Sequence, residues 1–341
     1  MFIRKLLLCL FLISCKICCQ AQEAWASPEL EQMHNNVLGY QKLGNYKDAI
    51  ITLNQLINLA PARTELKTEL GNLYYLSGNY DLAIATLKPL LKNTIASDTT
   101  YQLLAACQLA MHQYKEANKT IKKGMISYGV SGMLYYRKGQ VLMHDGDSEA
   151  AIKSWTEGVL KCPQEPSNYI AASLSILKSD NVLYGLLLGE TYLAMRADTA
   201  GNDSLKTAIF NKWKTFFESL ATKATFRNPM DDRINEIFLQ LTPVVSDGIT
   251  TENLTMLRTR FLLECAKKYS FDEMGSLLQY HDQLIRNGWF DIYNEWLFGK
   301  AGHAGQYEAW NKFHIGDIER FENWRSTHLL KAPPNFVVFD H

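Results

Sequence analysis

The chain has 341 residues, of which 47% are hydrophobic, so it is long enough and apolar enough to bury a sizeable core. Its 35 Lys and Arg side chains balance its 35 Asp and Glu side chains, which argues against nucleic acid as a partner because no basic surplus can neutralise phosphates. Beyond residue 20 only Cys107, Cys162 and Cys265 remain, which is no disulfide framework. Cys107 is expected to be a buried, inert thiol.

The first 21 residues have the pattern of a secretory signal peptide. Arg4 and Lys5 precede the apolar run Leu6 to Ile13, which is far shorter than the roughly 20 apolar residues of a membrane-spanning helix. No later segment qualifies as a transmembrane helix. The pattern therefore predicts an exported protein of the periplasm or outer membrane.

Two cleavage patterns overlap in this leader. Cleavage after Ala21 by an ordinary signal peptidase would leave Gln22 as the first residue. The segment Leu12-Ile13-Ser14-Cys15 instead resembles a bacterial lipobox, in which Cys15 would carry a lipid anchor. Simple export is favoured, because Lys16 and the cysteines that follow are an unusual start for a lipoprotein.

A repeat of 34 residues follows. Four alanines, Ala49, Ala83, Ala117 and Ala151, recur at this spacing without an insertion. Five positions earlier stand Gly44, Gly78, His112 and Gly146, so the third copy has a histidine where the others have a turn glycine. Small residues at Gly71, Ala105 and Gly139 would let two helices approach closely where they cross. Pro61 and Pro163 would end the second helix of their units.

These residues resemble the tetratricopeptide repeat family, whose unit is a helix, a turn and a second helix. The resemblance implies an all-α fold, a right-handed helical-hairpin solenoid with a C-terminal helical cap. Four units are predicted over residues 30–163, and a degenerate fifth over 164–197 with Gly185 at the crossing. A rival interpretation takes Leu188, Gly189 and Tyr192 as the first helix of a new hairpin. The uninterrupted frame is preferred because it needs no insertion.

Residues 204–332 are predicted to be helical, because apolar residues keep a spacing of three and four. Helices are expected at about 204–224, 231–241, 251–269 and 271–287, and residues 333–341 are expected to form an extended tail. The glycine-rich segment Gly299–Gly305, which carries His303, is predicted to be a flexible loop between two helices.

Four tryptophans, Trp289, Trp296, Trp310 and Trp324, fall in one aromatic-rich window. The favoured interpretation is a terminal cap, because a solenoid must cover its exposed end. The alternative is a stacking platform for a glycan or solute in an envelope lipoprotein, which requires at least two exposed indoles.

Stacked hairpins of this type create a concave groove lined by the first helix of each unit, and this groove is the predicted site for a protein or peptide partner. Its amide, aromatic and methionine side chains suit an extended peptide or a helix. The residues predicted to face it are His34, Leu38, Gln41, Thr68, Asn72, Tyr75, Leu76, Gln102, Ala106, Leu109, Met133, Tyr136, Gln140, Met143 and His144. Co-chaperones of the family hold a C-terminal carboxylate with a set of lysines, arginines and asparagines, of which only Asn72 and Lys42 are available here, so that function is rejected.

No enzyme motif, cofactor motif or metal-ligand spacing is present. His281 and Asp282 are merely adjacent, and adjacent helix residues point apart. The segments Asp98-Thr99-Thr100, Asp198-Thr199-Ala200 and Asp203-Ser204-Leu205 resemble the O-glycosylation acceptor of exported Bacteroidetes proteins, although helix starts at Asp98 and Asp203 are favoured. The sequence therefore predicts a non-catalytic interaction scaffold in the cell envelope.

Overall fold

The computed structural model describes residues 25–92, 96–179, 182–196, 201–221, 236–245, 248–268 and 275–331, and these residues form helices, turns and no strand. The all-α prediction is therefore confirmed. The chain divides into two compact units, Met1–Leu103 and Leu104–His341. The predicted leader and the predicted extended tail lie outside the described residues. Within the described part, no helix combines the length and the apolar character needed to cross a membrane.

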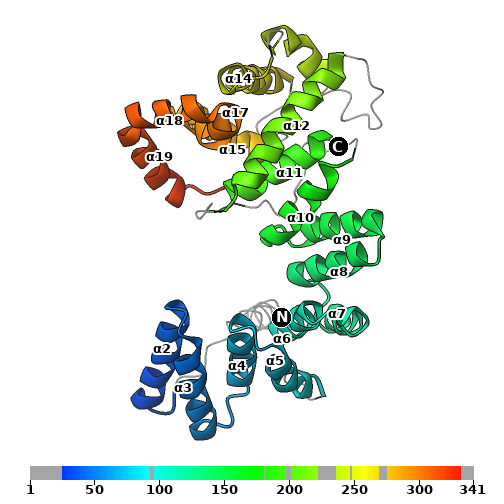
Figure 1. Cartoon of the computed structure of the whole chain (residues 1–341), viewed down its shortest axis with the longest axis vertical. Helices are drawn as coiled ribbons and strands as arrows, with labels where there is room; N and C mark the ends of the chain where they lie inside the picture. The colour runs from blue at the N-terminus through cyan, green and yellow to red at the C-terminus, as the bar shows by residue number, and fades with distance from the viewer. Residues whose placement is uncertain are drawn as a thin grey trace, which may run out of the picture. The chain divides into compact units, whose positions relative to one another are not determined.

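The first unit consists of two helical hairpins and the start of a third (Figure 1). Its helices are α2 (Pro28–Lys42), α3 (Tyr46–Leu59), α4 (Glu65–Leu76), α5 (Tyr80–Leu87), the 3-10 segment η1 (Lys88–Lys92) and the first half of α6 (Asp98–Ala110). Helix α2 packs against α3, and α4 packs against α5. Leu53 and Leu56 of α3 meet Leu66 and Leu73 of α4 in one buried core, so successive hairpins share their apolar faces.

The second unit continues the pairing. It contains α7 (Tyr114–Tyr128), α8 (Gly132–His144), α9 (Ser148–Lys161), α10 (Pro166–Ile176) and α11 (Val182–Ala194). Helix α8 packs against α9, and α10 packs against α11, which also contacts α12 (Figure 1). A Cβ atom on Gly185 would lie 3.0 Å from Leu177, and one on Gly189 would lie 2.6 Å from Ser173 and 3.0 Å from Ile209. The glycines of both competing frames are therefore points of close helix contact.

The turn position of the repeat has a left-handed backbone in every copy. The φ angles are 72° at Gly44, 77° at Gly78, 56° at His112 and 83° at Gly146. Among the described residues, His112 is the one non-glycine with a positive φ. A side chain in this region costs roughly 1–2 kcal/mol, because its Cβ approaches the following carbonyl. The third copy therefore keeps the family turn at an energetic cost.

Close helix crossings account for the small residues of the repeat. All four period alanines are completely buried, at 0% exposure. A Cβ atom on Gly71 would lie 2.5 Å from Leu87, and one on Gly139 would lie 2.2 Å from the indole nitrogen of Trp155. Trp155 fills this space and donates a hydrogen bond of 3.0 Å to the carbonyl of Tyr136. The glycine at position 139 is therefore the partner of the large ring at position 155.

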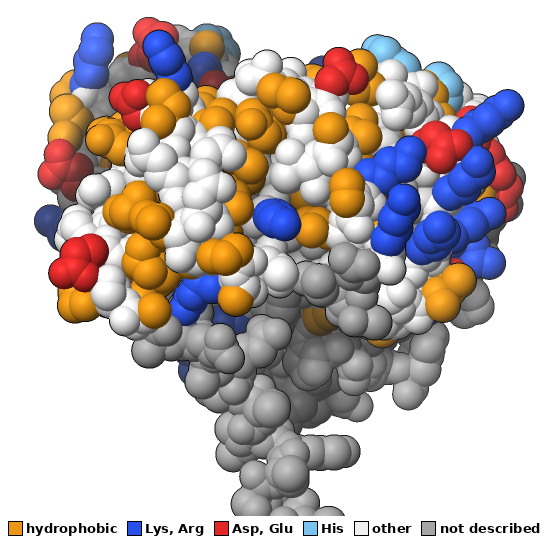
Figure 2. Space-filling view, turned by 90° about the horizontal axis from the view of Figure 1, so that it is seen from below, with side chains coloured by type: hydrophobic (Ala, Val, Ile, Leu, Met, Phe, Trp, Pro, Cys, Tyr) orange, Lys and Arg blue, Asp and Glu red, His pale blue; other side chains and the backbone are white. Residues whose placement is uncertain are grey.

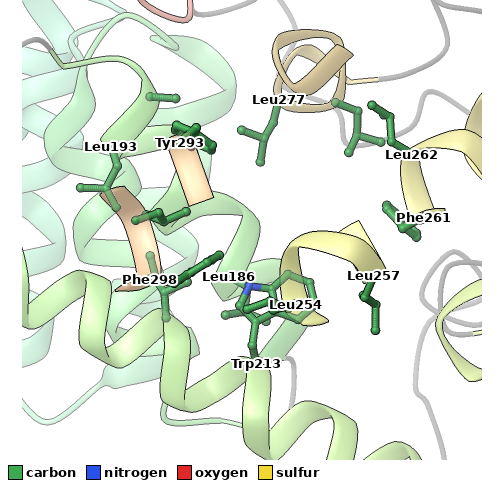
Figure 3. Packing of buried hydrophobic residues seen from close by; sticks show 14 of the residues in the cluster. Leu186, Leu193, Trp213, Leu254, Leu257, Phe261, Leu262, Leu277, Tyr293 and Phe298 are labelled. Atoms are coloured by element: carbon green, nitrogen blue, oxygen red, sulfur yellow. The ribbon is translucent and has the colours of Figure 1, made fainter. Parts of the chain in front are cut away.

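Past α11, further helices gather around one large apolar core. They are α12 (Asp203–Ala221), a helical segment over 236–241 with the 3-10 turn η2 (Thr242–Val245), α14 (Thr251–Lys268), α15 (Ser276–Arg286), α16 (Phe290–Asn294), the π-helical segment η3 (Glu295–Gly299), α17 (Lys300–Gly302), α18 (Ala304–Phe313) and α19 (Ile315–Thr327). Figure 3 shows Leu193 of α11 in this interior, together with Trp213, Leu257 and Phe298 of the later elements. The end of the described chain returns to α11, where the amide of Leu330 donates to the carbonyl of Ala194 at 3.0 Å.

Two predictions in this region need correction. The flexible loop expected at Gly299–Gly305 is wrong, because α17 and α18 continue the helical course and only His303 interrupts them. The ring nitrogen Nδ1 of His303 caps α18 by accepting from the amide of Gln306 at 3.3 Å. The helix expected over 271–287 starts later among the described residues, at Ser276. Residues 222–235 and 269–274, which contain one boundary of each of the four predicted helices, lie outside the described residues.

Candidate functional site

Three groups of residues are candidates for function: the first-helix face of the repeats, a pocket beside the C-terminal tryptophans, and a buried polar cluster. The first-helix face is the set of residues predicted to line the groove. In the first unit, Leu38 of α2 and Leu76 of α4 are 47% and 40% exposed, and Asn72 and Tyr75 are partly exposed beside them. Tyr75 lies against Tyr80, with ring centroids 5.7 Å apart.

Other predicted residues of this unit are engaged within the protein. His34 is only 8% exposed, and its Nε2 lies 2.9 Å from Oε2 of Glu69, which joins α2 to α4. Thr68 and Thr100 place their hydroxyl oxygens 3.0 Å apart, and Gln102 donates to Asp98 at 2.7 Å. These three side chains are fixed by internal hydrogen bonds, whereas Leu38 and Leu76 remain open to solvent. Gln41 is partly exposed.

In the second unit, α8 carries most of the predicted face. Gln140 donates to the hydroxyl of Tyr136 at 3.1 Å and accepts from Arg137 at 2.9 Å. These contacts hold an amide, a phenol and a guanidinium in one partly exposed row. Met143 is 38% exposed at the end of this row, and Met133 and Leu109 are partly exposed. Ala106 is buried at 4% exposure, so its assignment to a solvent-facing surface was wrong.

Sequence reasoning missed two neighbours of this row. Arg137 was not assigned to the face, although its position three residues before Gln140 places it on the same side of a helix. Tyr114 of α7 stacks on His144 with ring centroids 3.3 Å apart, and its hydroxyl lies 2.9 Å from Nδ1 of His112. His144 therefore presents one ring face to Tyr114.

The four C-terminal tryptophans are each partly buried. Trp289 lies 6.4 Å from Trp324 between ring centroids, and Trp324 stacks on His328 at 4.5 Å. Trp310 stacks on His314 at 4.5 Å. These contacts are those of a packed cap, in which the rings cover one another.

Two cations contact the ring of Trp296. Nζ of Lys206 lies 3.7 Å from the ring centroid and donates to the Trp296 carbonyl at 2.9 Å, and the guanidinium carbon of Arg325 lies 4.6 Å from the ring centroid. Burial lowers the pKa of Lys206 to about 8. Trp296 belongs to the π-helical segment, a geometry that is frequent at functional sites.

A pocket of about 410 Å³ opens beside these rings. Its walls come from α16, the π-helical segment, α18 and α19, and most of its lining side chains are apolar. We call this the corner pocket; its lining residues are Ile292, Trp296, Tyr307, Trp310, Asn311, Lys312, Ile315, Ile318, Glu319, Phe321 and Glu322. Two of the four predicted tryptophans thus share one cavity, and Trp289 and Trp324 do not line it.

The buried polar cluster lies where α11, α14, α15 and α16 meet. Glu190 is 1% exposed and Arg258 is 4% exposed, and they form an ion pair. Nε2 of His281 lies 2.7 Å from Oε1 of Glu190, and the hydroxyl of Tyr293 donates to the same oxygen at 3.0 Å. Arg258 also donates to the side-chain oxygen of Asn294. Each charge is thus matched in a site that excludes water.

Electrostatics in this cluster favour a charged Glu190 and a neutral His281. Burial alone raises the pKa of Glu190, but Arg258, His281 and Tyr293 outweigh it and lower that pKa to about 2. Burial lowers the pKa of His281, although Glu190 opposes the change. Burial also raises the pKa of Tyr293 well above its usual value. Glu190, Arg258 and His281 are all buried, so a substrate has no access to them. The role of the cluster is therefore structural: it joins the helices that carry these residues.

Sequence reasoning dismissed His281 because Asp282 beside it points away, and the true partner is 91 positions earlier in the chain. One signal was present. Glu190 is the single charged residue in the otherwise apolar helix Val182–Ala194, and a lone charge on an apolar helix needs a partner.

The described residues contain no group of three or more His, Cys, Asp or Glu side chains arranged to hold a metal ion. Burial raises the pKa of the Cys107 thiol to about 11, which is the expected property of an inert buried cysteine. Cys265 is also buried, and Cys162 is partly exposed.

The hairpins, the turn glycines and the close crossings define a helical-hairpin repeat protein. Residues 42–124 match the family model described as anaphase-promoting complex, cyclosome, subunit 3. Within these residues, the 34-residue period and the hairpin geometry are those of tetratricopeptide-type repeats. Among curated proteins, no significant sequence match is found.

Several solved structures resemble the chain. A thermophilic tetratricopeptide repeat protein of Thermus thermophilus is 15% identical, with a TM-score of 0.45 over 54% of this chain and 98% of its own. A MamA structure is 19% identical, with a TM-score of 0.38 over 46% of this chain and 91% of its own. MamA from Desulfovibrio magneticus is 16% identical, with a TM-score of 0.40 over 50% of this chain and 96% of its own.

Proposed function

We propose that this protein is a non-catalytic scaffold of the cell envelope that binds a peptide or helix of a partner protein along its first-helix face. The observation that carries the proposal is the row on α8. Tyr136, Arg137 and Gln140 are held by hydrogen bonds of 2.9 and 3.1 Å while remaining partly exposed. Preorganised side chains lose little conformational entropy when a partner binds.

The chemistry of this face supports a protein partner. In the first unit, the amide of Asn72 can pair with the backbone of an extended or helical segment, and Leu38 and Leu76 offer apolar contact. In the second unit, Gln140 and Met143 offer the same two kinds of contact. Figure 2 shows one face of the molecule, on which hydrophobic side chains are interspersed with charged and other residues. The first-helix face thus combines both kinds of contact, as interaction surfaces do.

Location in the envelope rests on the leader pattern of residues 1–21, which is a property of the sequence. Mass spectrometry of the mature N-terminus tests it. A first residue at Gln22 supports simple export, and a lipid-modified Cys15 supports the anchored form. An intact Met1 in fractionated cells contradicts export.

Crosslinking in intact cells tests the scaffold. We expect Tyr136→Ala combined with Met143→Ala, or Tyr75→Ala alone, to abolish capture of a specific protein. The matched control is Tyr128→Ala, which removes a 41% exposed tyrosine of α7 outside the first-helix face. All variants must keep the circular dichroism of the native chain. Unchanged capture by both first-helix variants contradicts the proposal.

Capture of a glycan by the tryptophan cluster is not adopted. Ile292, Ile315 and Ile318 line the corner pocket together with Trp296 and Trp310. These three side chains offer no hydrogen bonds to sugar hydroxyls, whose burial without such bonds is unfavourable, and the polar groups of the lining come only from its other residues, such as Asn311 and Glu319. The corner pocket suits an apolar side chain better.

A further inference from the structure

The corner between α18 and α19 exposes an aromatic ring directly beside the corner pocket. Phe313, the last residue of α18, is 87% exposed, and Ile315, the first residue of α19, is 57% exposed. Burial of such side chains stabilises a protein, because it removes apolar surface from water. Phe313 does not line the pocket of its own chain, although its neighbour Lys312 does. The fold of its own chain therefore leaves the Phe313 ring almost entirely unburied.

The corner pocket is large enough for a ring of this kind. An apolar cavity of about 150 Å³ can bind benzene, and the corner pocket measures about 410 Å³. Trp310, Ile315 and Ile318, which are partly buried or exposed, provide the contacts that a phenyl ring prefers. The remaining volume would admit part of a neighbouring residue.

The charges around the pocket are of both signs and lie on different helices. Lys312 comes from α18, and Glu319 and Glu322 come from α19. A residue that entered the pocket with a basic neighbour would meet these carboxylates. The pair Lys312-Phe313 has this composition, an aromatic ring that follows a cation.

We propose that this corner is a self-association surface, on which Phe313 of one copy enters the corner pocket of a second copy. A two-fold axis makes the exchange reciprocal, because a two-fold interface pairs the same patch with itself. Lys312 of each copy then faces Glu319 and Glu322 of the other. The partner copy thus completes the pocket with one aromatic ring and one cation.

The expected complex is weak and depends on concentration. A single corner buries less surface than the roughly 1,200–2,000 Å² of stable specific interfaces. Each copy contributes the apolar contact of one ring, and the entropy lost on association offsets part of this gain. We therefore expect a Kd in the micromolar range. The proposal is independent of the scaffold function, since it uses residues of α16, the π-helical segment, α18 and α19 and none of the first-helix face.

Sedimentation velocity of the purified full chain, over roughly 1 µM to 500 µM, tests the proposal. We expect a monomer–dimer equilibrium that Phe313→Ser weakens at least tenfold. Ile126→Ser is the matched control, because Ile126 is 85% exposed on α7 and away from the corner. A monomer at every concentration overturns the proposal, and so does a dimer that Phe313→Ser leaves unchanged. Oligosaccharide that quenches tryptophan emission of a purely monomeric chain would assign the pocket to sugar instead.

A charge exchange separates this interface from any other mode of dimerisation. Lys312→Glu alone and the pair Glu319→Lys with Glu322→Lys should each weaken self-association, because like charges then face each other. A mixture of the two variants should restore dimers, since the acid introduced at position 312 meets the introduced lysines and the native contacts remain on the other side. Failure of the mixture to associate more strongly than either variant contradicts the two-fold exchange.

Discussion

Nε2 of His281 lies 2.7 Å from Oε1 of Glu190 and joins α15 to α11 across 91 positions of the chain. Arg258 and Tyr293 bind the same carboxylate oxygen, so four helices meet at one buried anion. A buried ion pair is a weak source of net stability, but breaking it leaves a charge without a partner. The cluster should therefore determine how these helices pack.

Removal of one charge from the cluster should destabilise the second unit strongly. We expect Glu190→Met or Arg258→Met to lower the free energy of unfolding by about 3–5 kcal/mol, because each leaves an unpaired buried charge. The double variant should cost clearly less than the sum of the two. Lys300→Met is the control, since its pair with Asp203 is 65% and 62% exposed and should contribute under about 1 kcal/mol. Urea titration followed by tryptophan fluorescence measures the stability of the two single variants, the double variant and the control. If the two single effects simply add in the double variant, Glu190 and Arg258 do not depend on each other and this interpretation is wrong.

Acid should weaken the same region in two stages. The folded pKa of His281 is lowered from 6.5, so the unfolded chain takes up the proton first and stability falls as the pH drops below about 6.5. The pKa of Glu190 is lowered from 4.5 to about 2 in the folded chain, so stability falls a second time as the pH drops from 4.5 to about 2. Urea midpoints measured at pH 8, 7, 6, 5, 4 and 3 should fall, and His281→Gln should flatten the part of this slope above pH 5. An unchanged slope in the variant means that another group titrates.

The turn of the third repeat can be improved. His112 has a φ of 56° where the other three copies have glycine. We expect His112→Gly to raise the free energy of unfolding by about 0.5–1 kcal/mol, because relief of the left-handed strain exceeds the loss of its contact with Tyr114. Gly146→His makes the reverse change in the next repeat and should destabilise by a similar amount. Thermal unfolding followed by circular dichroism compares the two variants with the native chain. A lower midpoint for His112→Gly would show that the backbone at His112 is not strained.

Two helical glycines should respond to alanine with opposite signs. A Cβ on Gly139 would lie 2.2 Å from Nε1 of Trp155, so Gly139→Ala should destabilise by about 1–3 kcal/mol through overpacking. Gly39 lies inside α2, and nothing lies within 4 Å of the position its Cβ would take, so Gly39→Ala should stabilise by about 0.5–1 kcal/mol. Chemical unfolding of both variants measures the difference. If alanine changes the free energy of unfolding in the same direction at both positions, helix propensity alone determines the effect.

The sequence by itself determined the hairpins, their turns and their crossings. A 34-residue spacing of alanine and glycine fixes which helix faces touch, because helix periodicity and turn stereochemistry are local properties. Even the missing glycine at His112 was visible as a departure from the period.

Only the tertiary structure decided what the C-terminal helices build. Glu190, Arg258, His281 and Tyr293 lie up to 103 positions apart, and no spacing rule brings them together. The exposure of Phe313 beside the corner pocket was likewise hidden, because the same aromatic periodicity fits a buried and an open ring. Burial and pairing of polar groups are set by packing between distant segments, which local patterns do not encode.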